Sequence, residues 1–446
     1  MNKKPTVLIL AYDFPPYVSV GALRPHAWLK YFKDFDLDPV VVTRQWSNEH
    51  GNELDYISPS ASEATIEDYS ESGIVLKTPY FPNLSNRLLL KHGRSKYRLL
   101  RKAITAWYEV VQFLRPVGPK KELYKTAREY LADNKINCIV ATGEPFVLFH
   151  YASKLSDEFN IPWIADYRDP WTLSKWRSKN PLFKIWNGTL ERLTLKNCSH
   201  IVTPNSSFID SIKAYSGSTP IDISKNGFDL EVVKDLEEIK QEDKELTISM
   251  AGLLYDYHPI DSVLHALSGF SEKKFQLRFY GLPRKDFFES DWSARYPELK
   301  DKIKFFPKME YVDLMQNLAK SNVLLLFNYY NNTGTKIYDY LAAKRKILFC
   351  YTNDSEANHL REKHFPNQIL EDHFEGMQEK ILRTTEAGIL VENKEQLSSF
   401  LSDLFDEFEQ KHSISCATKN IEQFSRKHGV GDLAKIIHSV AQQNNS

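Results

Sequence analysis

The sequence predicts an α/β protein made of two doubly wound domains, each a parallel sheet covered by helices. The chain has 446 residues, which is more than one hydrophobic core usually supports. Short apolar runs alternate with longer amphipathic stretches, and this alternation is typical of βαβ units and parallel sheets. The apolar runs fall into two series, separated by the turn-forming residues Lys225, Asn226 and Gly227.

The first series of strands is expected in the N-terminal half of the chain. Residues 6–11 are almost continuously apolar, as in a buried strand of a parallel sheet. A helix is expected at residues 22–35, where Pro25 is acceptable because the first turn of a helix needs no N–H donor. Further strands are expected at residues 39–43, 138–142, 163–166 and 200–203.

The second series of strands begins after the turn at residue 227. Strands are expected at residues 246–251, 275–280, 303–306, 323–327, 347–351 and 388–391. The tail at residues 421–440 has apolar residues at helical spacing and is expected to form an amphipathic helix. In doubly wound sheets, ligands bind at the carboxyl ends of the strands, so loops that follow strands are the first places to look for function.

The composition argues against several classes of protein. The 58 basic and 58 acidic residues balance, which gives no sign of nucleic-acid binding. The four cysteines form no C-x-x-C pair, so no zinc site is expected, and so few cysteines fit a reducing compartment. No apolar run approaches the roughly 18 residues of a transmembrane helix, and the N-terminus lacks the pattern of a signal peptide. We therefore expect a cytoplasmic protein.

Two segments break the alternation of strands and helices. Residues 46–72 carry seven acidic residues and no Lys or Arg, and we expect a long surface loop there. Residues 87–121 carry ten Lys or Arg and a single acid, Glu109, with large apolar residues interleaved. A basic amphipathic segment of this kind is typical of contact with an anionic membrane surface. The alternative is a solvated helix face packed on its own domain. The candidate membrane contacts are Arg94, Lys96, Arg98, Arg101 and Lys102.

The segment around residue 336 is the most informative part of the chain. A predicted strand at residues 323–327 leads into a polar loop ending in Gly334 and Thr335, and a helix follows. The start of a helix presents unpaired N–H groups and the positive end of the helix dipole, which favour a phosphate. Lys336 adds a positive charge there, and Asp339 can accept hydrogen bonds from hydroxyls. These are the requirements of a sugar-nucleotide site, although the same pattern also fits an ordinary strand–helix junction.

Several motifs occur in order along the chain. They are residues 14–24 (FPPYVSVGALR), 141–146 (ATGEPF), 161–171 (IPWIADYRDPW), 202–205 (VTPN), 225–229 (KNGFD), 251–255 (AGLLY) and the Lys336 segment. Together they resemble the family-4 glycosyltransferases, in particular the bacterial surface-polysaccharide branch, over residues 5 to 430.

The resemblance implies a GT-B fold, in which two Rossmann-like domains face each other across a cleft. Residues 1–225 would form the acceptor domain and residues 226–425 the nucleotide-sugar domain, with a last helix at about 426–446 packing back on the first. The family generally retains anomeric configuration and needs neither a metal nor another cofactor. No enzyme nucleophile is thought to be obligatory, so none is named.

The resemblance also assigns donor-binding residues. Gly21 would let a backbone approach phosphate, and Val20 stands where the family often has a second glycine. Arg24, one turn later, could reach an anion; the alternative is a surface arginine. Lys336 matches the family lysine, and Asp339 stands where the family glutamate holds the ribose. The family's other glutamate is replaced by Asn331.

The second domain opens its first strand–helix loop at Gly252. The six residues that follow lack the Arg or Lys that many family members place on the diphosphate. His258 could substitute weakly, although a surface histidine is the other interpretation. Gly334 and Thr335 complete the expected donor-binding set.

On the acceptor side, Arg168 and Asp169 follow a predicted strand, as in the family loop that faces donor sugar and acceptor. Asp169 could orient or deprotonate a hydroxyl, and Arg168 could hold a phosphate. The alternative is an internal Arg–Asp pair. Glu144 follows another strand on the same rim and is a further acceptor-side candidate.

The sequence thus favours a cytoplasmic glycosyltransferase, and the basic segment predicts a peripheral position on the inner face of the plasma membrane. Its partners would be a nucleotide sugar, a glycan or lipid-linked acceptor, and an anionic membrane, but no nucleic acid. A non-catalytic GT-B relative in a glycan-assembly complex is the alternative, which Val20, Asn331 and the missing cation after Gly252 favour mildly. A GT-B epimerase or phosphorylase is a third possibility.

Overall fold

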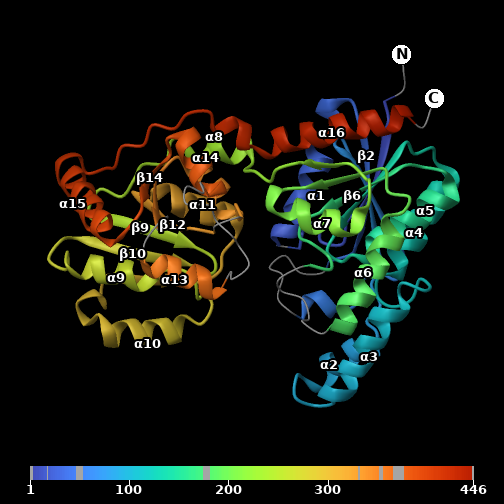
Figure 1. Ribbon diagram of the computed structural model, residues 1–446, viewed down its shortest axis with the longest axis horizontal. Helices are drawn as coiled ribbons and strands as arrows, with labels where there is room; N and C mark the ends of the chain where they lie inside the picture. Colours follow the sequence, from blue (N-terminus) through green and yellow to red (C-terminus); the bar gives the residue numbers. More distant parts are fainter. Residues whose placement is uncertain are drawn as a thin grey trace. The chain divides into compact units, whose positions relative to one another are not determined.

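The computed structural model describes residues 4–17, 19–46, 54–173, 181–329, 332–350, 355–364 and 376–443. The chain divides into two compact units, Met1–Asn226 with Arg426–Ser446, and Gly227–Ser425. Each unit holds one sheet with helices on both faces (Figure 1). The two Rossmann-like α/β sheets predicted from the alternation of apolar runs and helices are therefore confirmed.

The first unit is built on a sheet in the order β3-β4-β2-β1-β5-β6-β7-β8, parallel except for the edge strand β3. Side chains alternate across it, so that Val7 and Ile9 join one core and Leu8 and Leu10 the other. The strands are β1 (Thr6–Leu10), β2 (Asp38–Arg44), β3 (Ile66–Ser70), β4 (Gly73–Thr78), β5 (Cys138–Gly143), β6 (Trp163–Tyr167), β7 (His200–Thr203) and β8 (Ile221–Ile223).

Helices cover both faces of this first sheet. Apolar residues of α1 and α16 pack on the face of Val7 and Ile9, and those of α4 and α5 on the opposite face. The helices are α1 (Val20–Tyr31), α2 (Leu84–His92), α3 (Arg98–Val111), α4 (Lys121–Asp133), α5 (Val147–Phe159), α6 (Pro181–Leu195), α7 (Ile209–Ser216) and α16 (Arg426–Gln443). Three 3₁₀ turns add η1 (Phe32–Phe35), η2 (Asp55–Ile57) and η3 (Ser206–Phe208).

The second unit is built on a parallel sheet in the order β11-β10-β9-β12-β13-β14. Ile248 and Met250 of β9 face the core formed with α9 and α15, whereas Leu324 and Leu326 of β12 face the core formed with α11 and α12. The strands are β9 (Leu246–Ala251), β10 (Phe275–Tyr280), β11 (Ile303–Phe306), β12 (Val323–Phe327), β13 (Lys346–Cys350) and β14 (Gly388–Val391).

The helices of the second unit begin with α8 before the first strand and then alternate with the strands, except that α13 and α14 both lie between β13 and β14. They are α8 (Leu230–Leu236), α9 (Ile260–Ser268), α10 (Lys285–Arg295), α11 (Tyr311–Lys320), α12 (Lys336–Ala343), α13 (Ser355–His364), α14 (Met377–Thr385) and α15 (Lys394–Lys411), with 3₁₀ turns η4 (Pro297–Leu299) and η5 (Ile421–Phe424).

Several local predictions were wrong. The acidic segment at residues 46–72 contains the edge strand β3, which sequence inspection missed because every residue of β3 is exposed and shows no apolar alternation. The first helix starts at Val20 rather than 22, because the Ser19 hydroxyl accepts the Ala22 N–H at 3.1 Å and caps it. Pro25 therefore lies inside α1, beyond the first turn.

The glycines of the tail have a packing role. Gly429 lies in α16 where a Cβ atom would come 2.3 Å from the Lys225 carbonyl oxygen, at the end of the first unit's sheet. The Ser224 hydroxyl donates to the Gly429 carbonyl oxygen at 2.9 Å. Close approach of helix and loop backbones at this point requires glycine.

We expect Gly429→Ala to destabilise the first unit by about 1–3 kcal/mol, because the added methyl group must push α16 away from residue 225. Chemical unfolding followed by circular dichroism would measure the loss. Gly269→Ala is the matched control, since its new Cβ would meet only the Ala266 carbonyl oxygen at 3.4 Å. An equal effect of the two substitutions would contradict this packing role.

Candidate functional site

Lys336 and Gly252 meet at the carboxyl ends of two neighbouring strands. Strands β9 and β12 pair in parallel, so the loops that follow them lie at the same edge of the sheet. The Lys336 ammonium group donates to the Leu253 carbonyl oxygen, and its Cε lies 3.3 Å from the place a Cβ atom on residue 252 would occupy. Gly252, at φ +74°, thus leaves room for the lysine side chain across its loop.

The surroundings of Lys336 favour the uncharged form of its amine. Burial lowers the pKa of Lys336 to about 7. His258 is buried beside it, where burial first and the Lys336 charge second lower the pKa of the imidazole. The His258 Nδ1 accepts the Tyr255 N–H at 3.3 Å, while its Nε2 has no hydrogen-bond partner among the described residues. His258 is therefore a buried, uncharged histidine, which differs from both sequence interpretations.

Helix α12 is anchored so that its first turn has a defined position. The Tyr340 hydroxyl accepts the N–H of Ala251, the last residue of β9, at 3.0 Å. No side-chain cap closes the start of the helix at Thr335, and the Gly334 N–H donates to the Asn332 Oδ1 at 3.1 Å. Within this turn the Tyr338 N–H donates to the Thr335 carbonyl oxygen at 3.1 Å, and the positive end of the helix dipole at Thr335 and Lys336 suits an anion.

Asp339 lies in the first turns of the same helix. Its carboxylate accepts the Tyr311 hydroxyl at 2.7 Å, which fixes the side chain while leaving it partly exposed. Asn331 stands where the resemblance would place a second glutamate, and it lies outside the described residues.

The loop after Gly252, where the resemblance would place an Arg or Lys for the diphosphate, carries aromatic residues instead. Tyr255 and Tyr257 stack with ring centroids 5.2 Å apart, and both rings contact Tyr329 at the end of β12. The loop after Gly252 thus carries stacked aromatic rings and His258, and of these His258 interacts electrostatically with Lys336.

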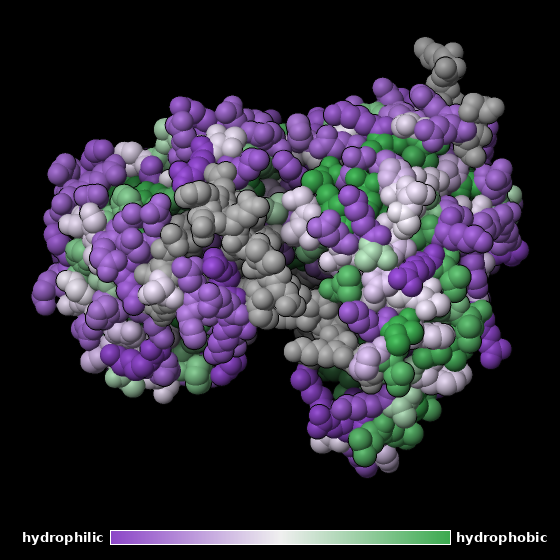
Figure 2. Space-filling view, viewed as in Figure 1, coloured by the Kyte–Doolittle hydropathy of each residue, from purple (hydrophilic) through white to green (hydrophobic). Residues whose placement is uncertain are grey.

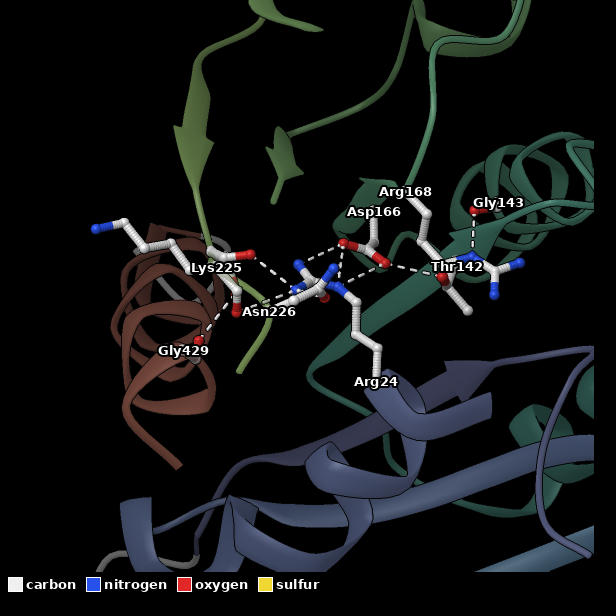
Figure 3. Close-up of polar contacts among 9 residues, drawn as sticks. Arg24, Thr142, Gly143, Asp166, Arg168, Lys225, Asn226 and Gly429 are labelled. Carbon is white, nitrogen blue, oxygen red and sulfur yellow. Dashed lines mark hydrogen bonds and ion pairs between the residues drawn. The ribbon is translucent and has the colours of Figure 1, made fainter. Parts of the chain in front are cut away.

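In the first unit, Arg24 forms a buried ion pair with Asp166 (Figure 3). The Arg24 Nη2 lies 2.7 Å and its Nε 2.9 Å from the Asp166 Oδ1, and the Thr142 hydroxyl donates to the Asp166 Oδ2 at 2.8 Å. The Arg24 Nη1 donates to the Ser224 carbonyl oxygen at 2.7 Å. The pair therefore joins helix α1, strands β5 and β6, and the residues that follow β8.

This geometry corrects the expectation for Arg24. Neither an exposed arginine nor an anion contact is observed, because the guanidinium group is buried and its donors are engaged by Asp166 and the residues at 224–226. Asp166 was overlooked, although its position at the end of β6 in an otherwise apolar strand was the available signal.

Gly21 and Arg168 are brought together in the same unit. A Cβ atom on residue 21 would overlap the Arg168 guanidinium group, at 1.8 Å from its Nη1. The Arg168 Nε donates to the Gly143 carbonyl oxygen at 2.7 Å, and its Nη1 lies 3.9 Å from the Asp13 Oδ2. The glycine therefore makes space for an arginine of this chain.

Asp13 is a carboxylate that sequence reasoning missed. Burial raises its pKa, and the nearby Arg168 and the Ser19 hydroxyl lower it in part. Its Oδ1 is buried with no hydrogen-bond partner among the described residues. The expected alternative of an Arg168–Asp169 pair is thus replaced by an Arg168–Asp13 pair.

Asp169 and Glu144 lie at the ends of neighbouring strands. The surrounding protein raises the pKa of Asp169, and the Arg168 charge lowers it in part. The Glu144 carbonyl oxygen accepts from the Arg168 Nη2. Glu144 also lines a cavity of about 370 Å³ together with residues of α3 and α6.

The basic segment forms the helical pair α2 and α3, which contact each other. None of the 14 residues of α3 is buried, and Leu99 and Trp107 are 82% and 52% exposed. Figure 2 shows apolar residues gathered over this pair, beside polar ones. All five predicted membrane-contact residues lie on these helices or the turn between them.

Across the described ranges, no three His, Cys, Asp or Glu side chains gather as a metal site would require. In the same ranges, no helix has both the length and the apolar character needed to span a bilayer.

We expect Asp166→Asn to lower the free energy of unfolding by about 3–5 kcal/mol, because it leaves the Arg24 charge buried without a counter-ion. Removing both charges in Arg24→Met/Asp166→Leu should cost less than the single change. Urea unfolding would measure both variants. Glu409→Gln, which breaks the exposed pair with Lys273, is the control and should cost much less, because solvent screens such a pair. Similar losses in Asp166→Asn and the control would contradict the assignment.

Neither a protein-family model nor a curated protein matches this sequence. The fold is similar to that of a glycosyltransferase from Rickettsia africae ESF-5, with a TM-score of 0.57, 14% identity and 99% of each chain covered. It is also similar to sucrose-phosphate synthase from Thermosynechococcus elongatus (TM-score 0.55, 12% identity, 98% of this chain and 97% of that chain). A third similar structure is the UDP-forming alpha,alpha-trehalose-phosphate synthase from Burkholderia vietnamiensis (TM-score 0.56, 11% identity, 99% and 98% covered).

Identities this low show the fold alone. The similarity extends over nearly the whole length of each chain and includes both Rossmann-like sheets. The chain therefore has the GT-B fold of glycosyltransferases.

Proposed function

We propose that this protein is a glycosyltransferase that moves a sugar from a nucleoside-diphosphate sugar to a glycan acceptor. The observation that supports this most directly is Lys336 lying across the Gly252 loop at the carboxyl ends of β9 and β12. An ammonium group beside uncapped N–H donors at a strand-end loop suits a diphosphate. The GT-B fold, which is that of glycosyltransferases, is the second support for this proposal.

In the proposed reaction, the bond between the anomeric carbon and the diphosphate oxygen breaks, and a bond to an acceptor oxygen forms. The departing diphosphate gains negative charge, which Lys336 and the N–H groups after Gly334 and Thr335 would stabilise. Asp339 would accept hydrogen bonds from the ribose hydroxyls. We propose a metal-independent reaction that retains anomeric configuration, in keeping with the family-4 resemblance.

The acceptor would bind the first unit. Asp169 would accept the proton of the attacking hydroxyl or orient it, and the raised pKa of Asp169 favours proton acceptance near neutral pH. Arg168 would hold the loop at residues 143–144 in place and could contact a phosphate of the acceptor. Asp13, paired with Arg168, would position that arginine.

The proposed cellular setting is the synthesis of a surface polysaccharide on a lipid-linked acceptor. The support is the exposed α2–α3 pair, in which Lys and Arg side chains flank exposed leucines and a tryptophan. Such a surface suits the inner face of an anionic plasma membrane, where a cytoplasmic enzyme would meet its acceptor.

The donor proposal is tested by the thermal stability of the protein with UDP, GDP, ADP and their sugars. UDP compounds come first, because one similar structure is UDP-forming and another, from E. coli, was bound with UDP-2-fluoro glucose. We expect one base class to raise the Tm of wild type and not of Lys336→Met. Lys344→Met, at the other end of α12 and paired with Glu237, is the matched control and should keep the shift.

The same experiment has a pH dependence. Lys336 has a pKa of about 7 when no anion is bound, and a diphosphate beside it would raise that value. Binding then takes up a proton, so the Kd should increase by up to about tenfold per pH unit above pH 7. Lys336→Arg keeps its charge and should remove this slope. No shift with any nucleotide, in a folded protein, would favour the non-catalytic alternative.

For the membrane proposal, we expect the wild-type protein to sediment with phosphatidylglycerol-rich vesicles. A variant with glutamine in place of five basic residues should stay in the supernatant; these residues are Arg94, Lys96, Arg98, Arg101 and Lys102. Each basic residue near an anionic surface contributes about 1 kcal/mol, so five changes are enough to abolish binding. The charge-matched control places Gln at five exposed lysines of the second unit, Lys244, Lys274, Lys300, Lys380 and Lys394. Release by the control set as well would show that the attraction is general rather than a property of α2 and α3.

A further inference from the structure

A cavity of about 370 Å³ lies in the first unit beside the carboxyl end of β5. Its volume is within the range of small-molecule sites. Helix α3 and the residues after it line one side, and the start of α6 lines another. None of the residues that line this cavity belongs to the proposed donor site.

Aromatic side chains dominate the wall of the cavity. Trp171 is stacked between Phe146 and Phe113, with ring centroids 5.1 Å and 5.6 Å away, and all three rings are buried. Phe183 and Trp186 of α6 line the cavity from a more exposed position. Flat rings of this kind provide surfaces for the C–H faces of a sugar, as aromatic residues do for other flat ligands.

Polar groups of both donor and acceptor type line the same cavity. The Glu109 carboxylate accepts from the Gln112 amide at 2.8 Å and retains further acceptor capacity. The Lys120 ammonium group makes no hydrogen bond among the described residues and lies 5.9 Å from the centre of the Tyr12 ring. Asn187 adds an amide. These groups match a ring of hydroxyls, which both donate and accept.

The charge of the lining selects among sugars. Among the described lining residues, Lys120 is the single cation, set against two carboxylates, Glu109 and Glu144. Burial lowers the pKa of Lys120 and the nearby Glu109 raises it in part, so Lys120 already interacts with a carboxylate of the lining. A carboxylate or phosphate on the ligand would meet, among these described residues, two carboxylates and no cation besides Lys120.

We propose that this cavity binds an uncharged sugar residue of the acceptor glycan and discriminates against anionic sugars. The proposal rests on the proposed glycosyl transfer, for which the cavity would hold the acceptor. Exposed apolar residues adjoin the lining on both sides, with Leu114 next to Phe113 and with Leu182 and Ile185 on α6. An uncharged sugar carrying an apolar aglycone therefore fits the cavity and its rim together.

The test uses octyl β-glucoside and octyl β-glucuronide below their micelle concentrations, with octanol as the chain-only probe, and the full-length protein in calorimetric titrations. The glucoside should bind more tightly than octanol, and the glucuronide about tenfold more weakly than the glucoside because of like-charge repulsion. Glu109→Gln should narrow the gap between the two glycosides, whereas Glu129→Gln, an exposed control on α4, should not.

A second pair of variants separates the cavity from the membrane surface. Trp186→Ala should weaken glucoside binding about tenfold through lost stacking, and Trp107→Ala, an exposed ring of α3 outside the lining, should not. Equal or tighter binding of the glucuronide, or equal effects of the two Trp changes, would overturn the proposal.

The outcome is separable from that of the donor site. Lys336→Met should leave glucoside binding unchanged, and Trp186→Ala should leave the nucleotide shift unchanged. Glucoside binding without any nucleotide shift would defeat glycosyl transfer and keep the cavity as a sugar site. A nucleotide shift without glucoside binding would support the donor site and overturn the assignment of the cavity as a sugar site.

Discussion

The buried pair of Arg24 and Asp166 is the interaction on which the first unit depends. Taking two charges out of water is costly, and the cost is repaid only when the geometry is good and the remaining donors and acceptors are satisfied. Here the Thr142 hydroxyl donates a hydrogen bond to the carboxylate, and the Ser224 carbonyl oxygen accepts one from the guanidinium group. Because the partners come from α1, β5, β6 and the residues after β8, the pair ties helix α1, whose first turn contains Gly21, to the end of the sheet. The proposed acceptor residues inherit their positions from it.

The two units treat buried cations in opposite ways. Arg24 is neutralised and hydrogen-bonded, which stabilises the fold but leaves the group unavailable to a ligand. Lys336 is desolvated near His258, and its ammonium group donates to the Leu253 carbonyl oxygen. The lowered pKa of Lys336 is the cost of that arrangement. A group that is unfavourable without its ligand can contribute more when an anion binds, and this is the physical reason to regard Lys336, rather than Arg24, as the functional cation.

Glycines illustrate how one residue type serves different needs. Gly21 was expected to let backbone approach phosphate and Gly252 to open a donor-site loop, and at each position an added Cβ atom would meet an arginine or lysine of this chain. Gly252 leaves room for Lys336, and Gly21 leaves room for Arg168, which in turn pairs with Asp13. Gly429 allows a helix and a loop to touch. In each case the glycine is explained by a contact that is distant in sequence.

The sequence by itself determined the two parallel sheets, most strand positions and the strand–loop–helix segment at Lys336, because these follow from local apolar periodicity and helix-start chemistry. It did not reveal β3, whose residues are all exposed, since a strand without a buried face has no apolar pattern. Only the tertiary structure decided which charged residues are paired and which are available. Arg24, Arg168 and His258 each acquired a different environment from the expected one, because burial and ion pairing are set by residues that are brought together from separate strands.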